Sequence, residues 1–287
     1  MMTQQSAGLR RQTELDAWFA APPDKRPMLV IAGPCVLESH ETNRRIANAL
    51  AEACTDLGLP LAFKASFDKA NRSSAHSNRG PGLEEGLEEL ARIGEEIDAP
   101  TCTDIHQPEQ AALAAAHVTM VQVPAFLCRQ TDLLVAAAES GAAVNVKKGQ
   151  FMAPSEMGNV VEKLKCAGGE QLMLTERGTF FGYHRLVNDF VGLGDLIDLA
   201  RDHACATCFD VTHSTQKPGE QGTASGGRPD RASLLCGAAA STGVDALFIE
   251  CHPEPAKGLS DAATMLPLES IPSLLRKAVR IRRAVSG

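Results

Sequence analysis

The segment MLVIAGPCVLESHETNRRIANALAEACTDLGLPLAFKAS (28–66) contains the pattern that decides the fold. A short apolar run, MLVIAGPC, is followed by a longer helical pattern and then by a second apolar run, PLAFKAS. Because each run is apolar at successive positions, it predicts a strand of a parallel sheet that is buried on both faces. A helix between two parallel strands serves as their crossover, so the segment predicts one β-α-β unit.

The same alternation continues along the chain. The predicted strands are 28–35, 60–66, 100–105, 120–126, 143–148, 171–177, 205–213 and 246–252. Helical patterns separate them, and a further one ends the chain; the pattern at 82–97 places Leu83, Leu87 and Leu90 close to one face. Because eight βα units are the number that closes a parallel barrel, the sequence predicts a (β/α)8 TIM barrel over residues 28–287. A doubly wound open sheet is the alternative, but it usually has fewer strands and less even repetition.

Two segments stand outside the repeat. Residues 1–27 predict an N-terminal extension or cap, with a helix around Trp18, and they lack the apolar core of a secretory signal. The stretch STQKPGEQGTASGGRPDR (214–231) is rich in Gly, Ser, Thr and Pro. A loop of this length in a compact barrel is typically a lid or a mobile segment.

Composition and charge narrow the range of partners. The 287 residues include 28 Lys and Arg against 35 Asp and Glu, a net charge of −7. This balance argues against a nucleic-acid or anionic-membrane partner that is bound by bulk charge, but it allows an anionic small molecule. The longest apolar stretch, 111–126, is interrupted by polar residues and Pro124, so no membrane span is predicted. Nine scattered cysteines indicate reduced thiols in a cytosolic protein.

Polar residues gather where the predicted strands end. They are Cys35, Lys64, Asp104, Gln122, Lys147, Arg177, His213 and Glu250. In α/β barrels the carboxyl ends of the strands carry the active site. The uneven placement of these side chains therefore predicts an enzyme.

Six cations are expected to meet at this rim. They are Lys64, Lys69, Arg72, Lys147, Lys148 and Arg177. Two partly buried unit charges 4 Å apart interact by roughly 4 kcal/mol at an effective dielectric of ~20, so unpaired cations are costly unless an anion is bound. We therefore expect a phosphorylated or carboxylated substrate. The alternative is that each cation pairs with a nearby acid such as Glu176 or Asp68.

A mixed group of metal-binding side chains is also brought together if the barrel closes. Cys35, His213 and Glu250 end the first, seventh and eighth strands, and Asp261 follows Glu250. Strand eight of a closed barrel neighbours strands one and seven. Sulfur, nitrogen and oxygen donors together suit Zn²⁺, Fe²⁺, Mn²⁺ or Co²⁺. From the residues alone, Cys35 could instead be a buried apolar side chain.

These motifs together resemble the 3-deoxy-D-manno-octulosonate 8-phosphate (KDO 8-phosphate) synthases. The matching segments are IAGPCVLES, FKASFDKANRSS, RGPGLEEGL, TDIHQP, VQVPAFLCRQTDLL, NVKKGQF, LTERGTFFGY, FDVTHS, ASGGR and FIECHPEPAKGLSD. The resemblance implies a (β/α)8 barrel that condenses phosphoenolpyruvate with D-arabinose 5-phosphate and releases inorganic phosphate. It also implies a cytoplasmic homotetramer whose product enters lipopolysaccharide.

The resemblance implies roles for individual residues. The phosphoenolpyruvate pocket falls on Lys69, Gln122, Ala125, Lys147 and Arg177, with Lys64 nearby. Arabinose 5-phosphate would meet Asn71, Arg72 and Ser73, with Asp104 and His106 in the same cavity. Arg129 would reach the site of a neighbouring subunit. We expect the catalytic residues to be Lys69, Asp104, Lys147, Arg177 and His213.

The resemblance also separates two types of enzyme. Metal-independent members have Asn at the position of Cys35, so this chain resembles the metal-dependent type, with His213, Glu250 and Asp261 as the other ligands. One departure is His184-Arg185 in place of the common Asn-Asn.

Two other functions stay open from the sequence. The nearest alternative is the related 3-deoxy-arabino-heptulosonate 7-phosphate synthase, which uses erythrose 4-phosphate. That group has Lys-Pro-Arg-Thr where this chain has KANRS (69–73), and the Asn-Arg-Ser version favours the five-carbon sugar. A remote alternative is a non-catalytic barrel that binds a phosphate ligand.

Overall fold

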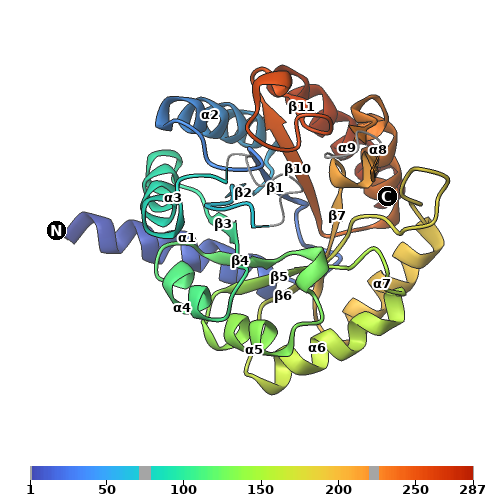
Figure 1. The fold of residues 1–287 in the computed structure, drawn as a ribbon, viewed down its shortest axis with the longest axis horizontal. Helices are drawn as coiled ribbons and strands as arrows, with labels where there is room; N and C mark the ends of the chain where they lie inside the picture. The colour runs from blue at the N-terminus through green and yellow to red at the C-terminus, as the bar shows by residue number, and fades with distance from the viewer. Residues whose placement is uncertain (1, 71–78, 220–225, 287) are drawn as a thin grey trace.

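The structure, a computed structural model, describes residues 2–70, 79–219 and 226–286. Its centre is a closed barrel of parallel strands (Figure 1). The barrel strands are β1 (Leu29–Gly33), β2 (Leu61–Lys64), β3 (Thr101–Asp104), β4 (Met120–Val123), β5 (Ala143–Lys147), β6 (Leu172–Glu176), β7 (Ala206–Asp210) and β10 (Ala246–His252). They are neighbours in chain order, and β10 closes the ring by pairing with β1 from Leu29↔Ala246 to Gly33↔Glu250. The predicted TIM barrel is confirmed, and the open sheet is excluded.

Helices surround the barrel, as Figure 1 shows. They are α2 (His40–Leu57), α3 (Leu83–Ile97), α4 (Glu109–Ala115), α5 (Thr131–Glu139), α6 (Met157–Cys166), α7 (Phe190–Asp202), α8 (Ala232–Thr242) and α9 (Ile271–Ser286). Local sequence explains their ends. In α2 the Ser39 side chain accepts a hydrogen bond from the Thr42 amide, and Gly58 at φ 64° ends the helix.

Successive side chains along each strand point to opposite faces, and this alternation divides the core into two parts. Outward side chains such as Val144 and Val146 pack against the helices, while Ala143, Asn145 and Lys147 take the opposite positions on β5. Inside the barrel, the amino-terminal half is apolar. Polar side chains fill the carboxyl-terminal half. The functional site therefore lies at the carboxyl ends of the strands.

Helix α1 (Met2–Ala20) covers the amino-terminal end of the barrel. Leu15 and Trp18 are buried in the same cluster as the inward side chains of the strands. The Trp18 indole donates a hydrogen bond to the Pro27 carbonyl at 2.7 Å, and the Arg26 guanidinium lies 4.8 Å from its ring centroid. Arg26 also pairs with Asp245 at 3.0 Å. These contacts attach the residues before β1 to the bottom of the barrel.

Trp18→Ala is expected to lower the free energy of unfolding by about 3–5 kcal/mol, because the indole is 5% exposed and its removal leaves a cavity. Urea unfolding followed by circular dichroism measures this change. Phe19→Ala is the matched control, because Phe19 is only partly buried against the same cluster. A Trp18→Ala protein as stable as the wild type would show that α1 contributes nothing to the barrel.

The long loop after β7 is more ordered at its described ends than the sequence predicts. Strand β8 (Gln216–Lys217) pairs antiparallel with β9 (Gly226–Gly227). The Gln216 carbonyl accepts a hydrogen bond from the Leu186 amide at 3.4 Å, which joins this loop to the one after β6. The middle of the predicted lid, 220–225, lies outside the described residues. Two short elements complete the fold: β11 (Leu266–Pro267) pairs with the end of β10, and the 3-10 turn η3 covers His213–Thr215.

Among the described helices, none has a stretch that is both long and apolar enough to cross a membrane.

Candidate active site at the carboxyl end of the barrel

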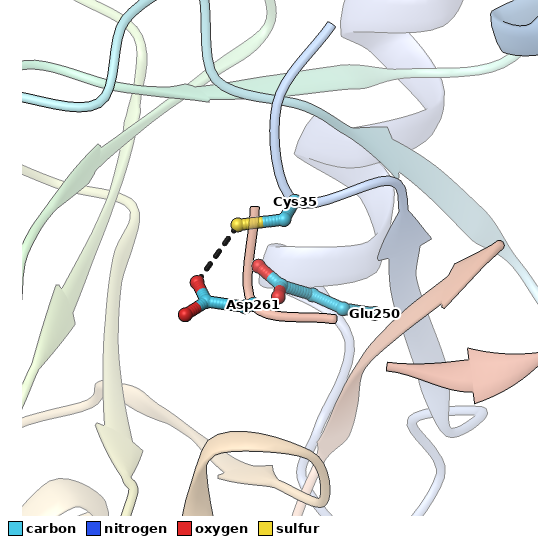
Figure 2. Close-up of side chains that lie close together, drawn as sticks. All are labelled: Cys35, Glu250 and Asp261. Atoms are coloured by element: carbon cyan, nitrogen blue, oxygen red, sulfur yellow. Dashed lines mark hydrogen bonds between the residues drawn. The ribbon is translucent and has the colours of Figure 1, made fainter. Parts of the chain in front are cut away.

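The four predicted metal ligands meet at the barrel mouth, although the sequence separates them widely. Cys35 follows β1, Glu250 is on β10, and Asp261 lies in the loop before β11 (Figure 2). The ligand atoms of these three residues lie within 4.8 Å of one another, and the Cys35 thiol donates a hydrogen bond to Asp261 Oδ2 at 2.9 Å. His213 Nε2 is 3.5 Å from Glu250 Oε2 and 3.7 Å from Asp261 Oδ2.

The residues fit a divalent metal ion. Both carboxylate oxygens of Glu250 are buried and accept no hydrogen bond from any residue that the structure describes. Lys64 Nζ lies 3.8 Å from Oε1, outside hydrogen-bonding distance. Buried polar atoms almost always have a hydrogen-bond partner, so these oxygens are available to coordinate a cation. Thiol, imidazole and carboxylate donors together suit Zn²⁺, Fe²⁺, Mn²⁺ or Co²⁺ and do not select one of them.

Protons occupy this group of side chains when no metal is bound. Burial raises the pKa of the Cys35 thiol well above its usual range, and the nearby charges of Asp261 and Glu250 raise it further. Burial alone would lower the pKa of His213, but the Asp210 and Glu250 carboxylates outweigh burial and raise this pKa to about 9. Metal binding must therefore release protons, and metal affinity should rise with pH.

Asp210, which sequence reasoning missed, connects the metal ligands to the cations. Its buried Oδ2 accepts hydrogen bonds from Lys147 Nζ and from His213 Nδ1, the latter at 2.7 Å. Oδ1 accepts from the amides of Thr212 and His213 at 3.1 and 2.8 Å. The predicted strand 205–213 was too long: β7 ends at Asp210, and His213 lies in η3. The alternation of Ala206, Cys208 and Asp210 toward the interior was the signal that could have identified this residue.

The expectation of unpaired lysines at the rim is wrong. Lys64 lies 3.0 Å from Asp104, Lys69 lies 3.5 Å from Asp261, and Lys147 pairs with Asp210. Lys148, which follows β5, pairs with Glu176 at 3.4 Å, and Glu176 is one of the two acids that the alternative named. Asp68 instead pairs with Arg79. The sequence shows the positions of the cations but not which carboxylates the fold brings to them.

Two groups at the mouth besides Glu250 keep unused hydrogen-bonding capacity. Arg177 donates through Nη2 to Gln216 Oε1 at 2.6 Å, but its buried Nη1 has no partner among the described residues. The buried Nδ1 of His106 has none there either. Burial lowers the pKa of His106 despite the nearby Asp104 carboxylate, so its ring is neutral at pH 7. A guanidinium and a neutral imidazole are thus available to a ligand.

A chain of hydrogen bonds fixes the polar side chains on β3 to β6. Gln122 donates through Nε2 to Asp104 at 2.5 Å and accepts through Oε1 from Asn145 at 2.9 Å. Thr175 donates to Asn145 Oδ1 at 2.6 Å. Burial would raise the pKa of Asp104, but Lys64 and Lys69 outweigh it and hold the pKa well below its usual range. The ionised Asp104 therefore sets which way the Gln122 amide points.

The remaining predicted residues are less directly connected to this group. Ala125 is buried in the turn after β4, and Arg129 is exposed just beyond that turn, out of hydrogen-bonding contact with the other site residues. Asn71, Arg72 and Ser73 lie outside the described residues.

The loop after β6 holds three non-glycine residues in the left-handed region. They are Phe181 at φ 75°, Tyr183 at 51° and His184 at 61°. A non-glycine residue in this conformation costs roughly 1–2 kcal/mol, and Asn tolerates it better than His. His184→Asn is therefore expected to raise the free energy of unfolding by about 0.5 kcal/mol, measured by urea unfolding. Arg185→Asn in the same loop is the control, and equal effects of both substitutions would contradict the explanation from backbone strain.

Comparison with known proteins shows the family of this chain. Residues 21–285 match the DAHP synthetase I family, and the chain belongs to that family. Three relatives carry the name 2-dehydro-3-deoxyphosphooctonate aldolase. The protein of Synechococcus sp. is 49% identical over 92% of this chain and 91% of its own, and that of Desulfotalea psychrophila is 48% identical over 91% of each. The protein of Nitratidesulfovibrio vulgaris strain DP4 is 50% identical over 86% of this chain and 89% of its own.

Proposed function

We propose that this protein condenses phosphoenolpyruvate with D-arabinose 5-phosphate and water to 3-deoxy-D-manno-octulosonate 8-phosphate and inorganic phosphate. The product is the compound that the relatives' name calls 2-dehydro-3-deoxyphosphooctonate. The observation that carries the proposal is the identity of 48–50% to these relatives over most of both chains. The positively charged groups at the mouth of the barrel support it, because both organic substrates are anions.

Phosphoenolpyruvate needs cations for its carboxylate and its phosphate. The buried Nη1 of Arg177 has no hydrogen-bond partner among the described residues, and a guanidinium can hold a carboxylate or phosphate through two parallel hydrogen bonds. Lys147 is held between the Asp210 carboxylate and the Phe248 ring, with Nζ 3.1 Å from the ring centroid. These contacts fix the ammonium before substrate arrives, which favours positioning of the anion. Lys69 and Gln122 complete the proposed pocket.

The reaction forms one carbon–carbon bond and breaks one carbon–oxygen bond. C3 of phosphoenolpyruvate attacks the aldehyde carbon of open-chain arabinose 5-phosphate, while the oxygen of water adds to C2. The C2–O bond to phosphate then breaks, and C2 becomes a ketone. One proton of the water ends on the new hydroxyl group, and the other ends on the released phosphate. The fixed cations at the mouth stabilise the negative charge that develops on these oxygens.

We further propose that Cys35, His213, Glu250 and Asp261 hold a divalent metal ion: Zn²⁺, Fe²⁺, Mn²⁺ or Co²⁺. When bound, such an ion polarises a carbonyl or lowers the pKa of a water molecule. Asp210 orients His213 by accepting its Nδ1 hydrogen, which leaves Nε2 facing Glu250 and Asp261.

We also propose how the protein assembles and where in the cell it is located. Phe126, Phe151 and Phe181 are exposed in the loops around the mouth, and exposed aromatic side chains commonly mark contacts between chains. Exposed Arg129 follows the turn that carries Phe126, so it suits a role in a neighbouring subunit's site within a homotetramer. All nine cysteines are free, which suits the reducing cytoplasm. The product would serve lipopolysaccharide synthesis.

The test of the assembly combines mass with activity. Light scattering is expected to give four times the chain mass of 30.4 kDa. Inactive Arg129→Ala protein mixed with inactive Arg177→Ala protein should regain activity, because mixed sites receive one intact residue from each chain. A monomer with full activity would contradict both parts of this proposal.

The function is tested by measuring phosphate release from phosphoenolpyruvate with arabinose 5-phosphate, before and after a chelator, and after Mn²⁺ is added back. Release that needs arabinose 5-phosphate supports the synthase. Release only with erythrose 4-phosphate favours the heptulosonate synthase, and no release with either sugar favours a binding protein. Activity that stays unchanged after all bound metal has been removed would keep the synthase but exclude the metal.

A further inference from the structure

We propose that Glu38 is a positioning residue for the metal site. Its carboxylate holds the segment 253–260 so that Asp261 meets Cys35 and Glu250. This inference rests on the metal site proposed above. It concerns a residue outside the proposed metal ligands and the proposed substrate pocket.

The Glu38 carboxylate joins two other parts of the chain. Its Oε1 accepts a hydrogen bond from the Leu259 amide at 3.1 Å, and its Oε2 lies 3.4 Å from His252 Nε2. His252 Nδ1 accepts a hydrogen bond from the Glu254 amide at 2.9 Å, so the ring hydrogen is on Nε2 and faces Glu38. The side chains of Glu38 and His252 are only 13% and 7% exposed, which strengthens both contacts.

Glu38 is itself held in place. Its amide donates to Asn43 Oδ1 at 3.0 Å, and its carbonyl accepts from Asn43 Nδ2 at 3.2 Å. Asn43 is fully buried on α2 and also donates to Glu89 on α3 at 3.0 Å. The carboxylate therefore extends from a fixed backbone, three residues after Cys35 on the same loop.

Asp261 needs support on both sides because it lies in a loop with φ 49°, a strained conformation for a residue other than glycine. After it, the amides of Thr264 and Met265 donate to its carbonyl at 2.9 and 3.1 Å. Before it, the bond from the Leu259 amide to Glu38 holds the chain two residues away. Glu38 thus ties the loop of one ligand to the loop of another. Strand β10, which carries Glu250, is included through His252.

Metal affinity measured on the full chain tests this role. Zn²⁺ and Co²⁺ would be titrated against a competing chromogenic chelator for wild type, Glu38→Ala, Glu38→Gln and the control Glu254→Ala. Glu254 lies in the same segment, but its exposed side chain pairs with Lys257. Loss of a residue that supports a ligand typically weakens metal binding about 10–100-fold, and we expect this for Glu38→Ala. Glu38→Gln should lose less, since its amide oxygen can still accept from the Leu259 amide while its NH₂ faces the His252 N–H.

Two further readouts distinguish positioning from a general loss of stability. Hydrogen exchange at the Leu259 amide of the metal-free protein should be faster in Glu38→Ala and unchanged in Glu254→Ala. The Co²⁺–thiolate charge-transfer band should still form at saturation but need more Co²⁺. If Glu38→Ala does not fold, Glu38→Met, which is similar in size and accepts neither hydrogen bond, answers the same questions.

The proposal is overturned if the folded Glu38→Ala or Glu38→Met protein binds both ions as tightly as wild type, or if its Leu259 amide exchanges at the wild-type rate. A wild-type protein that binds neither ion overturns the metal site itself. The titration of the wild-type protein gives that result before any variant is compared.

Discussion

Cys35→Ser is expected to reduce metal-dependent phosphate release by at least about 100-fold, because loss of a ligand should exceed the 10–100-fold effect typical of a residue behind a ligand. The thiol is 1% exposed and hydrogen-bonded to Asp261, so serine keeps the shape and the contact. What it loses is the thiolate, the softer and more acidic donor. The variant would be stripped with chelator, reloaded with Zn²⁺ or Mn²⁺, and assayed with phosphoenolpyruvate and arabinose 5-phosphate.

Cys54→Ser is the matched control for this substitution. Cys54 is also 1% exposed, but it is on α2 and packs in the core, and burial raises its pKa to about 12. It should retain wild-type activity and metal content. Full activity in a metal-stripped Cys35→Ser protein would remove the metal from the reaction and leave Cys35 as a packing residue.

The pH dependence of metal binding provides a second check on Cys35. Its raised pKa means that the thiol is protonated in the metal-free protein across the neutral range. Because binding displaces that proton, apparent affinity should increase about tenfold for each pH unit per proton released. In Cys35→Ser this slope should be smaller by about one proton.

The barrel could be predicted from sequence because its signal is repeated. Each βα unit repeats the same pattern of an apolar strand followed by a helix. An error of two or three residues at one strand end therefore does not alter the number of predicted strands. Closure of the ring then predicts that residues as distant as Cys35 and Asp261 meet, which they do through a hydrogen bond of 2.9 Å. The order of the strands in the closed barrel predicts this contact, whereas the spacing of the two residues in the sequence does not.

Pairing of charges was not predictable in the same way. Lys64, Lys69 and Lys147 were placed at the correct end of the barrel, but whether Asp104, Asp261 and Asp210 would meet them depends on side-chain directions within the closed ring. A single misplaced strand end was enough to hide Asp210.

The partly buried pair of Lys69 and Asp261 has a consequence for ligand binding. A metal that joins Asp261 competes with the Lys69 ammonium, which lies 3.5 Å from the same oxygen. Burial alone would lower the pKa of Lys69, but Cys35 and Asp261 outweigh it and raise the pKa well above its usual range. Lys69 therefore stays charged, and metal binding would free it to meet an anionic substrate. Metal and phosphoenolpyruvate are accordingly expected to bind better together than separately.

Asp210→Asn is expected to lower the free energy of unfolding of the metal-free protein by about 3–5 kcal/mol near pH 7, because it leaves two buried cations without their shared partner. Burial would raise the pKa of Asp210, but His213 and Lys147 outweigh it and hold that pKa well below its usual range. Its contribution to stability is therefore present above about pH 4, the unfolded pKa, and is lost as the pH falls further.

The contribution of His213 to stability depends on pH in the opposite direction. The pKa of His213 rises from 6.5 to about 9 on folding, so its contribution is full below pH 6.5 and is lost as the pH rises to about 9. The difference between wild type and Asp210→Asn should thus be largest between about pH 4 and 6.5 and should shrink toward pH 9 as His213 loses its proton. Urea unfolding at pH 5.5, 7 and 9 measures this profile, with Asp230→Asn on the exposed pair to Arg228 as a flat control. A difference that is independent of pH would mean that Asp210 does not share a proton-linked pair with His213, and a negligible difference at every pH would mean that the buried carboxylate supports neither cation.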